Sequence, residues 1–224
     1  MTARPNLALR SVERQEEAPG QQHLRLLTEA GAIDCRLQAA ETGDAAVLWV
    51  FGAGGGLGGP AGGLYTRLGQ RLRPRGITSL ELAYRHPGRL QDCVQDVLLG
   101  LDWLGSEGRR RVVLVGHSFG GAVVITAGAA TEVVIAVAAL SSQTRGTEAV
   151  AELAPRPLLV AHGTADEVLP DSCAKDIHRR AREPKDLTLY PGCRHGLDQC
   201  HEALDRDLLG WLERVLGLVP GRGF

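Results

Sequence analysis

The sequence of 224 residues has little lysine, few aromatic residues and no long apolar run. Lys175 and Lys185 are its only lysines, aromatic residues make up 4% of the chain, and the formal net charge is -1. A chain with so little net charge has no overall field to attract nucleic acid or an acidic membrane. No apolar run approaches the roughly 20 residues that cross a membrane, and polar residues 1–20 lack a signal-like apolar core. We therefore expect a globular protein that binds neither nucleic acid nor membrane.

Cysteine is also scarce and shows no C-x-x-C pair. An odd, scattered set is typical of a reducing compartment, so we expect free thiols, no disulfide framework and a cytoplasmic protein. Two of the cysteines flank His195, but metal ligands want closer spacing. We expect no metal site and no cofactor. The five cysteines are Cys35, Cys93, Cys173, Cys193 and Cys200.

The pattern of apolar runs predicts a flexible leader over residues 1–20 and a single domain over residues 21–224. Alternating strands and helices predict a three-layer α/β/α sandwich around a mostly parallel sheet of about eight strands. An N-terminal hairpin adds an antiparallel edge to that sheet. The expected strands are 23–29, 33–40, 45–51, 77–83, 112–115, 133–140, 157–161 and 187–190, and the expected helices 64–72, 89–104, 122–127, 172–181 and 197–216.

The strand at 112–115 runs into Gly116-His117-Ser118-Phe119-Gly120 and then into an apolar helix. A serine between two glycines at a strand-to-helix corner is typical of the G-x-S-x-G nucleophile elbow. The glycines are needed because strand and helix nearly touch, and the serine is held in a strained conformation with its hydroxyl exposed. Ser118 is therefore the candidate nucleophile, and His117 is expected to have a structural role beside it.

A serine hydroxyl needs a neighbouring base, and that base needs a third group to orient it. The strand at 157–161 leads into a loop presenting Asp166, and the strand at 187–190 leads through a turn to His195. We favour Asp166 over its neighbour Glu167, whose side chain should point elsewhere, and we expect His162 to orient the loop. The order Ser, Asp, His is the α/β-hydrolase order.

With these motifs the sequence resembles a small α/β-hydrolase fold enzyme of the dienelactone-hydrolase-like or carboxylesterase kind. The resemblance rests on the elbow, on the acid loop 162–170 (HGTADEVLP) and on the histidine loop 192–196 (GCRHG), and it covers about residues 23–217. It implies that Ser118 attacks an acyl carbonyl, that His195 moves the proton, and that Asp166 orients the imidazole. Dienelactone hydrolases carry cysteine as the nucleophile, whereas position 118 here is serine.

The segment Gly52–Pro60 follows a central strand and is the most glycine-dense part of the chain. It lacks the Gly-Lys-Ser/Thr ending of a phosphate-binding loop. In a hydrolase, the loop at this place supplies an oxyanion-hole N–H. We predict that the backbone N–H groups of Phe119 and Ala53 form this hole, with Gly54 as the alternate for Ala53. The alternative is a merely flexible loop.

The substrate pocket is harder to infer, and we place it on residues that follow strands, where ligands collect in such sheets. Arg85 could bind a substrate carboxylate, which would favour a dienelactone-like acid, or it could pair with a surface carboxylate. Only about sixteen residues separate the strand ending at Leu140 from the strand beginning at Pro157, so the cap is minimal or absent and the site open. The candidate pocket residues are Leu57, Tyr65, Arg85, Ser142, Val168 and Leu169.

Taken together, the motifs predict a serine hydrolase that cleaves small carboxylic esters or thioesters through an acyl-enzyme on Ser118. One alternative is a dienelactone hydrolase-like or small peptidase activity with the same triad. Another is a hydrolase fold without catalysis that serves as a binding module, although such proteins usually lose a triad member. The expected partner is a small-molecule acyl substrate, and the sequence leaves the oligomeric state open.

Overall fold

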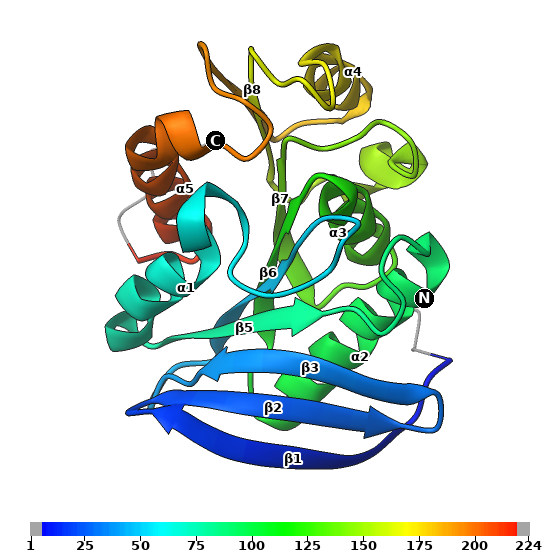
Figure 1. Ribbon diagram of the computed structural model, residues 1–224, viewed down its shortest axis with the longest axis vertical. Helices are drawn as coiled ribbons and strands as arrows, with labels where there is room; N and C mark the ends of the chain where they lie inside the picture. Colours follow the sequence, from blue (N-terminus) through cyan, green and yellow to red (C-terminus); the bar gives the residue numbers. More distant parts are fainter. Residues whose placement is uncertain (1–5, 219–224) are drawn as a thin grey trace.

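The computed structural model describes residues 6–218 and has a nine-stranded sheet between two layers of helices (Figure 1). The strands are β1 (Leu9–Ala18), β2 (Gln21–Thr28), β3 (Gly31–Gln38), β4 (Ala45–Val50), β5 (Ile77–Ala83), β6 (Arg111–His117), β7 (Val134–Leu140), β8 (Leu158–Gly163) and β9 (Lys185–Tyr190). The α-helices are α1 (Pro60–Leu72), α2 (Leu90–Ser106), α3 (Phe119–Ala129), α4 (Ser172–Arg180) and α5 (His201–Val215). Short 3-10 helices occupy Arg73–Arg75, Glu148–Leu153 and Asp198–Cys200.

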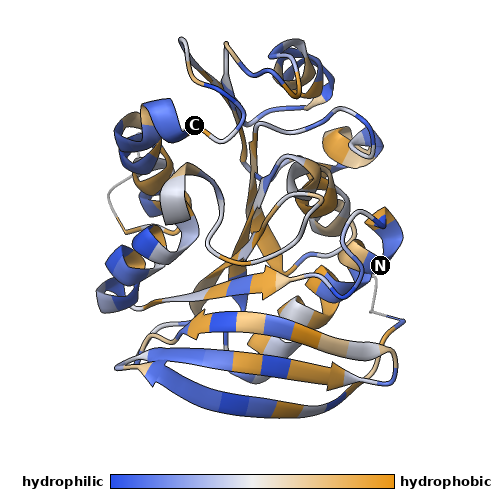
Figure 2. Cartoon of the chain, viewed as in Figure 1, coloured by the Kyte–Doolittle hydropathy of each residue, from blue (hydrophilic) through white to orange (hydrophobic). Residues whose placement is uncertain are grey.

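The strand order is β1-β2-β3-β5-β4-β6-β7-β8-β9, in which β4 to β9 run parallel to one another, while β1 pairs with β2, β2 with β3 and β3 with β5 in antiparallel fashion. Every residue of β4 is buried, which explains its unbroken apolar sequence. Figure 2 shows the same pattern, with apolar residues gathered in the central strands and polar ones along β1. The predicted α/β sandwich with a mostly parallel sheet is confirmed.

The two faces of the sheet carry separate apolar cores. On one face Leu68 of α1 and Trp211 of α5 pack against odd-numbered residues of β4 such as Val47. On the other face α2, α3 and α4 supply the buried helix residues, Val123 and Ile177 among them. This arrangement brings the carboxyl ends of the parallel strands, and the loops that follow them, to one edge of the molecule.

The N-terminal part of the chain corrects one prediction. Residues 9–18, assigned to a flexible leader, form β1, which pairs antiparallel with β2 and makes the outermost strand. The hairpin of β2 and β3 forms as predicted but is not the edge, and the sheet has nine strands rather than about eight. The sequence concealed β1 because nine of its ten residues are exposed, so it has no alternating buried face to reveal it. Residues 1–5 of the predicted leader lie outside the described part.

Two helix boundaries bear on the site. In α1, Ala61, Gly62 and Gly63 have φ of 51°, 62° and 97°, so regular helical geometry begins at Leu64, as predicted. In contrast, α5 begins at His201 rather than at Leu197, whose φ of 61° is left-handed. Between β7 and β8 the chain forms only the short 3-10 helix Glu148–Leu153. Among the helices of residues 6–218, none has the length and apolar character to cross a membrane.

Candidate active site

The elbow has the predicted strained geometry between β6 and α3. Ser118 has φ 57° and ψ -121°, a conformation that L-residues rarely adopt. A Cβ on Gly116 would overlap the carbonyl oxygen of Gly120, and one on Gly120 would overlap that of Phe51. Strand β6 therefore meets α3 too closely for a side chain at position 116, and the end of β4 meets α3 too closely for one at position 120, which explains the two glycines.

Ser118, His195 and Asp166 form a continuous hydrogen-bonded chain. The Oγ of Ser118 lies 3.0 Å from Nε2 of His195, and Nδ1 of His195 lies 2.8 Å from Oδ2 of Asp166. A carboxylate only accepts, so Nδ1 carries the proton and Nε2 is free to accept the serine O–H. The imidazole can thus take a proton from Ser118 while the carboxylate holds its orientation.

The side chain of Asp166 has no solvent exposure, and its carboxylate is surrounded by donors. Its Oδ1 accepts the N–H groups of Val168 and Leu169 at 2.9 and 2.8 Å. Burial raises the pKa of Asp166, but the Leu169 N–H, His195 and the Val168 N–H together outweigh it, so the pKa lies below its ordinary value. The carboxylate is therefore ionised and able to stabilise an imidazolium. Glu167 instead accepts the backbone N–H of His195, at 3.4 Å.

His117 lies between the elbow and the histidine loop (residues 192–196). Its Nε2 lies 2.9 Å from the carbonyl oxygen of His195, so Nε2 carries the proton and donates. The two imidazole rings are 4.9 Å apart between centroids, and the Phe51 ring lies 5.4 Å away. Burial lowers the pKa of His117 to about 4. The imidazole of His117 is therefore neutral and fixes the backbone of the loop that presents His195.

The glycine loop (residues 52–59) lies beside the nucleophile. A Cβ on Gly52 would stand 3.5 Å from Cβ of Ser118. Ala53 and Gly54, the next two residues of the loop, are exposed. The Phe119 N–H is at the first position of α3, where a helix leaves such donors without a backbone partner. The predicted donors thus belong to segments that meet at Ser118, and their role as an oxyanion hole remains a prediction.

The far end of the glycine loop has an anchor that the sequence analysis missed. Glu81, in the middle of buried strand β5, accepts the Gly58 N–H at 2.5 Å and the Thr66 hydroxyl at 2.7 Å, and pairs with Arg36 at 3.2 Å. The sequence could have indicated this anchor, because a charged residue in an otherwise buried strand must have polar partners.

The start of α1 also contacts the histidine loop, since the Ala61 N–H donates to the carbonyl oxygen of Gly196 at 2.8 Å.

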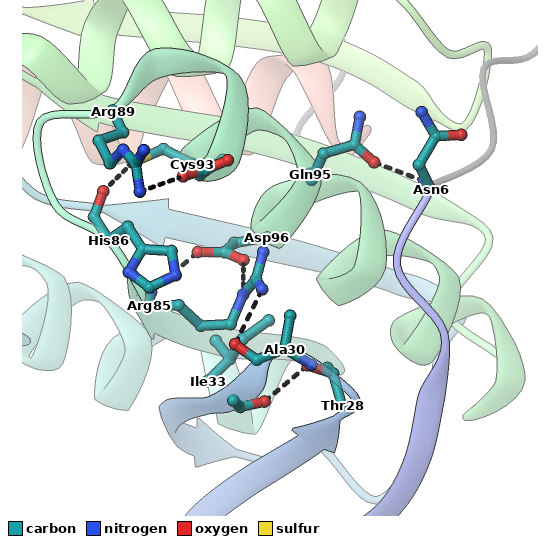
Figure 3. A network of polar contacts seen from close by, with 12 residues as sticks. Asn6, Thr28, Ala30, Ile33, Arg85, His86, Arg89, Cys93, Gln95 and Asp96 are labelled. Atoms are coloured by element: carbon teal, nitrogen blue, oxygen red, sulfur yellow. Dashed lines mark hydrogen bonds and ion pairs between the residues drawn. The ribbon is translucent and has the colours of Figure 1, made fainter.

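The structure contradicts the proposed ligand role of Arg85. Its Nε lies 2.5 Å from Oδ1 of Asp96, its backbone N–H also donates to that carboxylate, and a further N–H donates to the Ala30 carbonyl (Figure 3). The Arg85 side chain is 6% exposed and that of Asp96 fully buried. Burial raises the pKa of Asp96 against the opposing effect of Arg85. Arg85 is therefore committed to a buried ion pair on α2 and does not line a substrate pocket.

Two other predicted pocket residues are structural. Tyr65 is buried, stacks on Trp49 and donates its hydroxyl to the Val50 carbonyl at 2.9 Å. Ser142 is fully buried and packs against Gly121 at the start of α3. Both were chosen because they follow strands or flank loops, but their side chains turn into the protein rather than toward the edge.

The remaining pocket candidates stay accessible at the catalytic edge. Val168 is 62% exposed, an unusual value for a large apolar residue, and Leu57 and Leu169 are partly exposed. A separate hollow of about 580 Å³ lies near the opposite edge of the sheet, by Gly20, Gln38 and Arg73, and includes none of the predicted pocket residues.

The cysteines give a second correction. Cys193 and Cys200 form a disulfide that links the histidine loop to the start of α5, while Cys35, Cys93 and Cys173 are free. The prediction of spectator thiols at 193 and 200 is therefore wrong. Separation by seven residues did not reveal the pair, because the left-handed turn at Leu197 is what brings the two cysteines together. Within residues 6–218, no group of three or more histidine, cysteine or acidic side chains is placed to hold a metal ion.

Comparison with solved structures shows the fold. Est1E from Butyrivibrio proteoclasticus superposes with a TM-score of 0.75 at 14% identity, over 87% of this chain and 99% of the other. A putative alpha/beta hydrolase from Agrobacterium tumefaciens gives 0.74 at 21% identity, over 89% and 99%. Dienelactone hydrolase from Anabaena variabilis gives 0.72 at 16% identity, over 86% and 97%. At these identities the likeness is one of fold, and the fold is that of the α/β-hydrolases.

Comparison of sequences adds the family. No curated protein sequence matches the chain. Residues 61–206 match the dienelactone hydrolase family, and this range contains Ser118, Asp166 and His195. The match spans more than half of the chain and agrees with the resemblance seen in the three motifs. The chain therefore belongs to the dienelactone hydrolase family of α/β-hydrolases.

Proposed function

We propose that the protein is a serine hydrolase that cleaves small carboxylic esters or thioesters through an acyl-enzyme on Ser118. The observation that carries the proposal is the chain of hydrogen bonds from Ser118 through His195 to buried Asp166. This is the arrangement in which a positioned imidazole activates a hydroxyl.

In the proposed mechanism, Nε2 of His195 takes the Ser118 proton as Oγ attacks the acyl carbonyl. The imidazolium is stabilised by Asp166 and returns the proton to the leaving group, which departs as an alcohol or thiol. Water then gives a proton to His195 as it attacks the acyl-enzyme, and the imidazolium returns that proton to Oγ as the bond to Ser118 breaks, releasing the acid and restoring the serine hydroxyl. The N–H groups of Phe119 and of Ala53 or Gly54 hold the oxyanion in both steps, and each such donor typically contributes about 3 kcal/mol.

The surroundings favour small or exposed acyl groups. The connection between β7 and β8 has no room for a large cap, and apolar contacts come from Val168, Leu169 and Leu57 at the rim. Because the Arg85 guanidinium is paired with Asp96, it is not free to bind a substrate carboxylate, and a dienelactone-like acid is therefore disfavoured as substrate. A binding module without catalysis is disfavoured, since the three side chains that catalysis would need are present and in contact.

A cytoplasmic location remains a prediction from the polar N-terminus and the scattered cysteines. The Cys193–Cys200 disulfide weighs against it, because such bonds persist mainly in oxidising compartments. Cell fractionation followed by thiol titration of the recovered protein would decide between a cytoplasmic location and an oxidising compartment.

The test is hydrolysis of a short-chain aryl ester by the wild type, by Ser118→Ala and by Ser172→Ala, an exposed serine at the start of α4. We expect Ser118→Ala to lose at least about a thousandfold in kcat, while Ser172→Ala keeps the wild-type rate. Both variants should unfold at the wild-type temperature. Turnover by Ser118→Ala at the wild-type rate would overturn the proposal. A serine-reactive fluorophosphonate should label the wild type and fail on His195→Ala.

A further inference from the structure

A second histidine contacts the carboxylate of Asp166. His162, near the end of β8, is fully buried, and its Nε2 lies 3.1 Å from Oδ2 of Asp166 and 3.0 Å from the carbonyl oxygen of Leu169. This is the same carboxylate oxygen that lies 2.8 Å from Nδ1 of His195. One oxygen of the carboxylate therefore stands between two imidazoles.

The protonation of His162 follows from its neighbours. Both groups near Nε2 are oxygens that only accept, so Nε2 carries the proton and donates it to the Leu169 carbonyl, with Oδ2 of Asp166 beside the same N–H. Within the described residues Nδ1 is buried and has no hydrogen-bond partner. A proton on Nδ1 would be a buried, unpaired donor, which is costly. His162 therefore carries a proton on Nε2, and this N–H lies at the Leu169 carbonyl with Oδ2 of Asp166 3.1 Å from the same nitrogen.

The contact between His162 and Asp166 matters because of the other groups around the carboxylate. A carboxylate offers about four lone-pair sites, and four nitrogens lie close to the Asp166 carboxylate. Those of Val168, Leu169 and His195 are hydrogen-bonded to it, and Nε2 of His162 lies 3.1 Å from Oδ2. The side chain has no solvent exposure that would let water replace a lost donor. A buried carboxylate that loses one donor interacts more strongly with those that remain, above all with the imidazolium of His195.

We propose that His162 is a positioning residue of the active site, acting through Asp166. The protonated edge of its ring, held 3.1 Å from Oδ2 by the hydrogen bond to Leu169, limits the movement of the carboxylate and offsets part of its charge, so that His195 is oriented without becoming too basic to release its proton. This inference rests on the proposed function, since it assigns a role within the same triad. A histidine that only ties the acid loop to β8 through Leu169 would leave the basicity of His195 unchanged.

Two variants separate these roles. His162→Gln places an amide N–H near the position of Nε2, whereas His162→Leu fills similar space without a donor. We expect His162→Leu to raise the pKa of His195, moving the acid limb of the kcat/KM profile upward by roughly half a pH unit, and to lower kcat roughly tenfold. His162→Gln should keep the acid limb at the wild-type pH and kcat within about threefold.

Other groups could also move this titration. Those facing His195 are Asp166 and Glu167 from the acid loop, Ser118 from the elbow and the imidazole of His117 from β6. None of them changes in the two variants, so a shift that appears only in His162→Leu reports the lost N–H. Melting curves and circular dichroism would establish that both variants are folded.

A measurement without substrate keeps this inference separate from the proposed function. The imidazole C–H resonance of His195, followed by NMR between pH 4 and 9, gives its pKa directly in all three proteins. A higher pKa in His162→Leu alone supports the inference even if no ester is turned over. Equal values in the three proteins, or equal shifts in both variants, would overturn it.

Discussion

On one side of Ser118, the elbow, the acid loop and the histidine loop pack against one another, whereas on the other side the glycine loop is half-buried, with Ala53, Gly54 and Gly56 exposed. A Cβ on Gly163 would overlap the carbonyl oxygen of Cys193, and His117 donates to the carbonyl of His195. In the glycine loop, a Cβ on Gly54 or Gly56 would meet nothing within 4 Å. The crowded side is held by contacts between segments, and the open side by its ends, at Gly52 and Gly58, and by Pro87 against Gly55.

This difference between the two sides fits the roles proposed for them, proton transfer on the crowded side and binding of the oxyanion on the open side. Proton transfer needs Ser118, His195 and Asp166 within a few tenths of an ångström of their working distances. Close packing of the segments that carry them holds the three side chains in these positions. An oxyanion hole needs only N–H groups directed at one point, which a short loop anchored at both ends can provide. The open side also leaves the room through which an acyl group would enter.

The largest effect is expected from Gly116→Ala on the crowded side. Its φ is not left-handed, so the substitution adds only a methyl group, and that methyl would overlap the Gly120 carbonyl oxygen. Strand β6 and helix α3 would have to separate, and we expect a loss of about 4 kcal/mol or more in the free energy of unfolding. Urea denaturation measures it. Wild-type stability in this variant would show that the elbow is less crowded than described.

An effect of intermediate size concerns the neutral histidine at the centre of the crowded side. Burial holds the pKa of His117 at about 4, below its unfolded value near 6.5, so the unfolded chain binds the proton first. The stability associated with His117 is complete above pH 6.5 and is lost as the pH falls toward 4, by about 3 kcal/mol. The lowered pKa of Asp166 acts only below this window.

His117→Gln isolates this effect, because glutamine can donate to the His195 carbonyl but does not titrate. Between pH 7 and pH 4 the free energy of unfolding should fall by about 3 kcal/mol less in this variant than in the wild type. Parallel curves for the two proteins would contradict the assignment of a buried neutral imidazole.

A smaller effect is expected from the disulfide of the crowded side. Closing a loop of this length contributes about 2 kcal/mol to stability, so replacing both Cys193 and Cys200 by serine should lower the free energy of unfolding by that amount. The activity should fall only a few-fold, because the loop keeps its hydrogen bonds to Ala165 and His117. Thiol titration of the unfolded wild type should find three free thiols. Five thiols would mean that the bond is absent.

How much the sequence predicted depended on the range of the interactions involved. The contact between Ser118, His195 and Asp166 was predictable because each of them follows a buried strand, and the carboxyl ends of parallel strands meet at one edge. β1 was hidden because an exposed edge strand takes its stability from pairing with β2 rather than from an apolar face. The roles of Arg85 and Cys200 depend on partners set by chain packing, Asp96 on α2 and Cys193 across a left-handed turn, which residue spacing does not encode.

The smallest effects are expected on the open side. Two glycines there, Gly54 and Gly56, distinguish the effect of limited space from the effect of backbone strain. Neither Gly54 nor Gly56 has an atom within 4 Å of an added Cβ, but Gly56 has a φ of 95° whereas that of Gly54 is not left-handed. Gly54→Ala should therefore change the free energy of unfolding by less than about 0.5 kcal/mol, and Gly56→Ala should lower it by about 1 kcal/mol. Chemical denaturation of the two variants side by side measures both. If Gly54→Ala cost as much as an elbow substitution, the glycine loop would be packed as tightly as the crowded side, and the contrast between the two sides would fail.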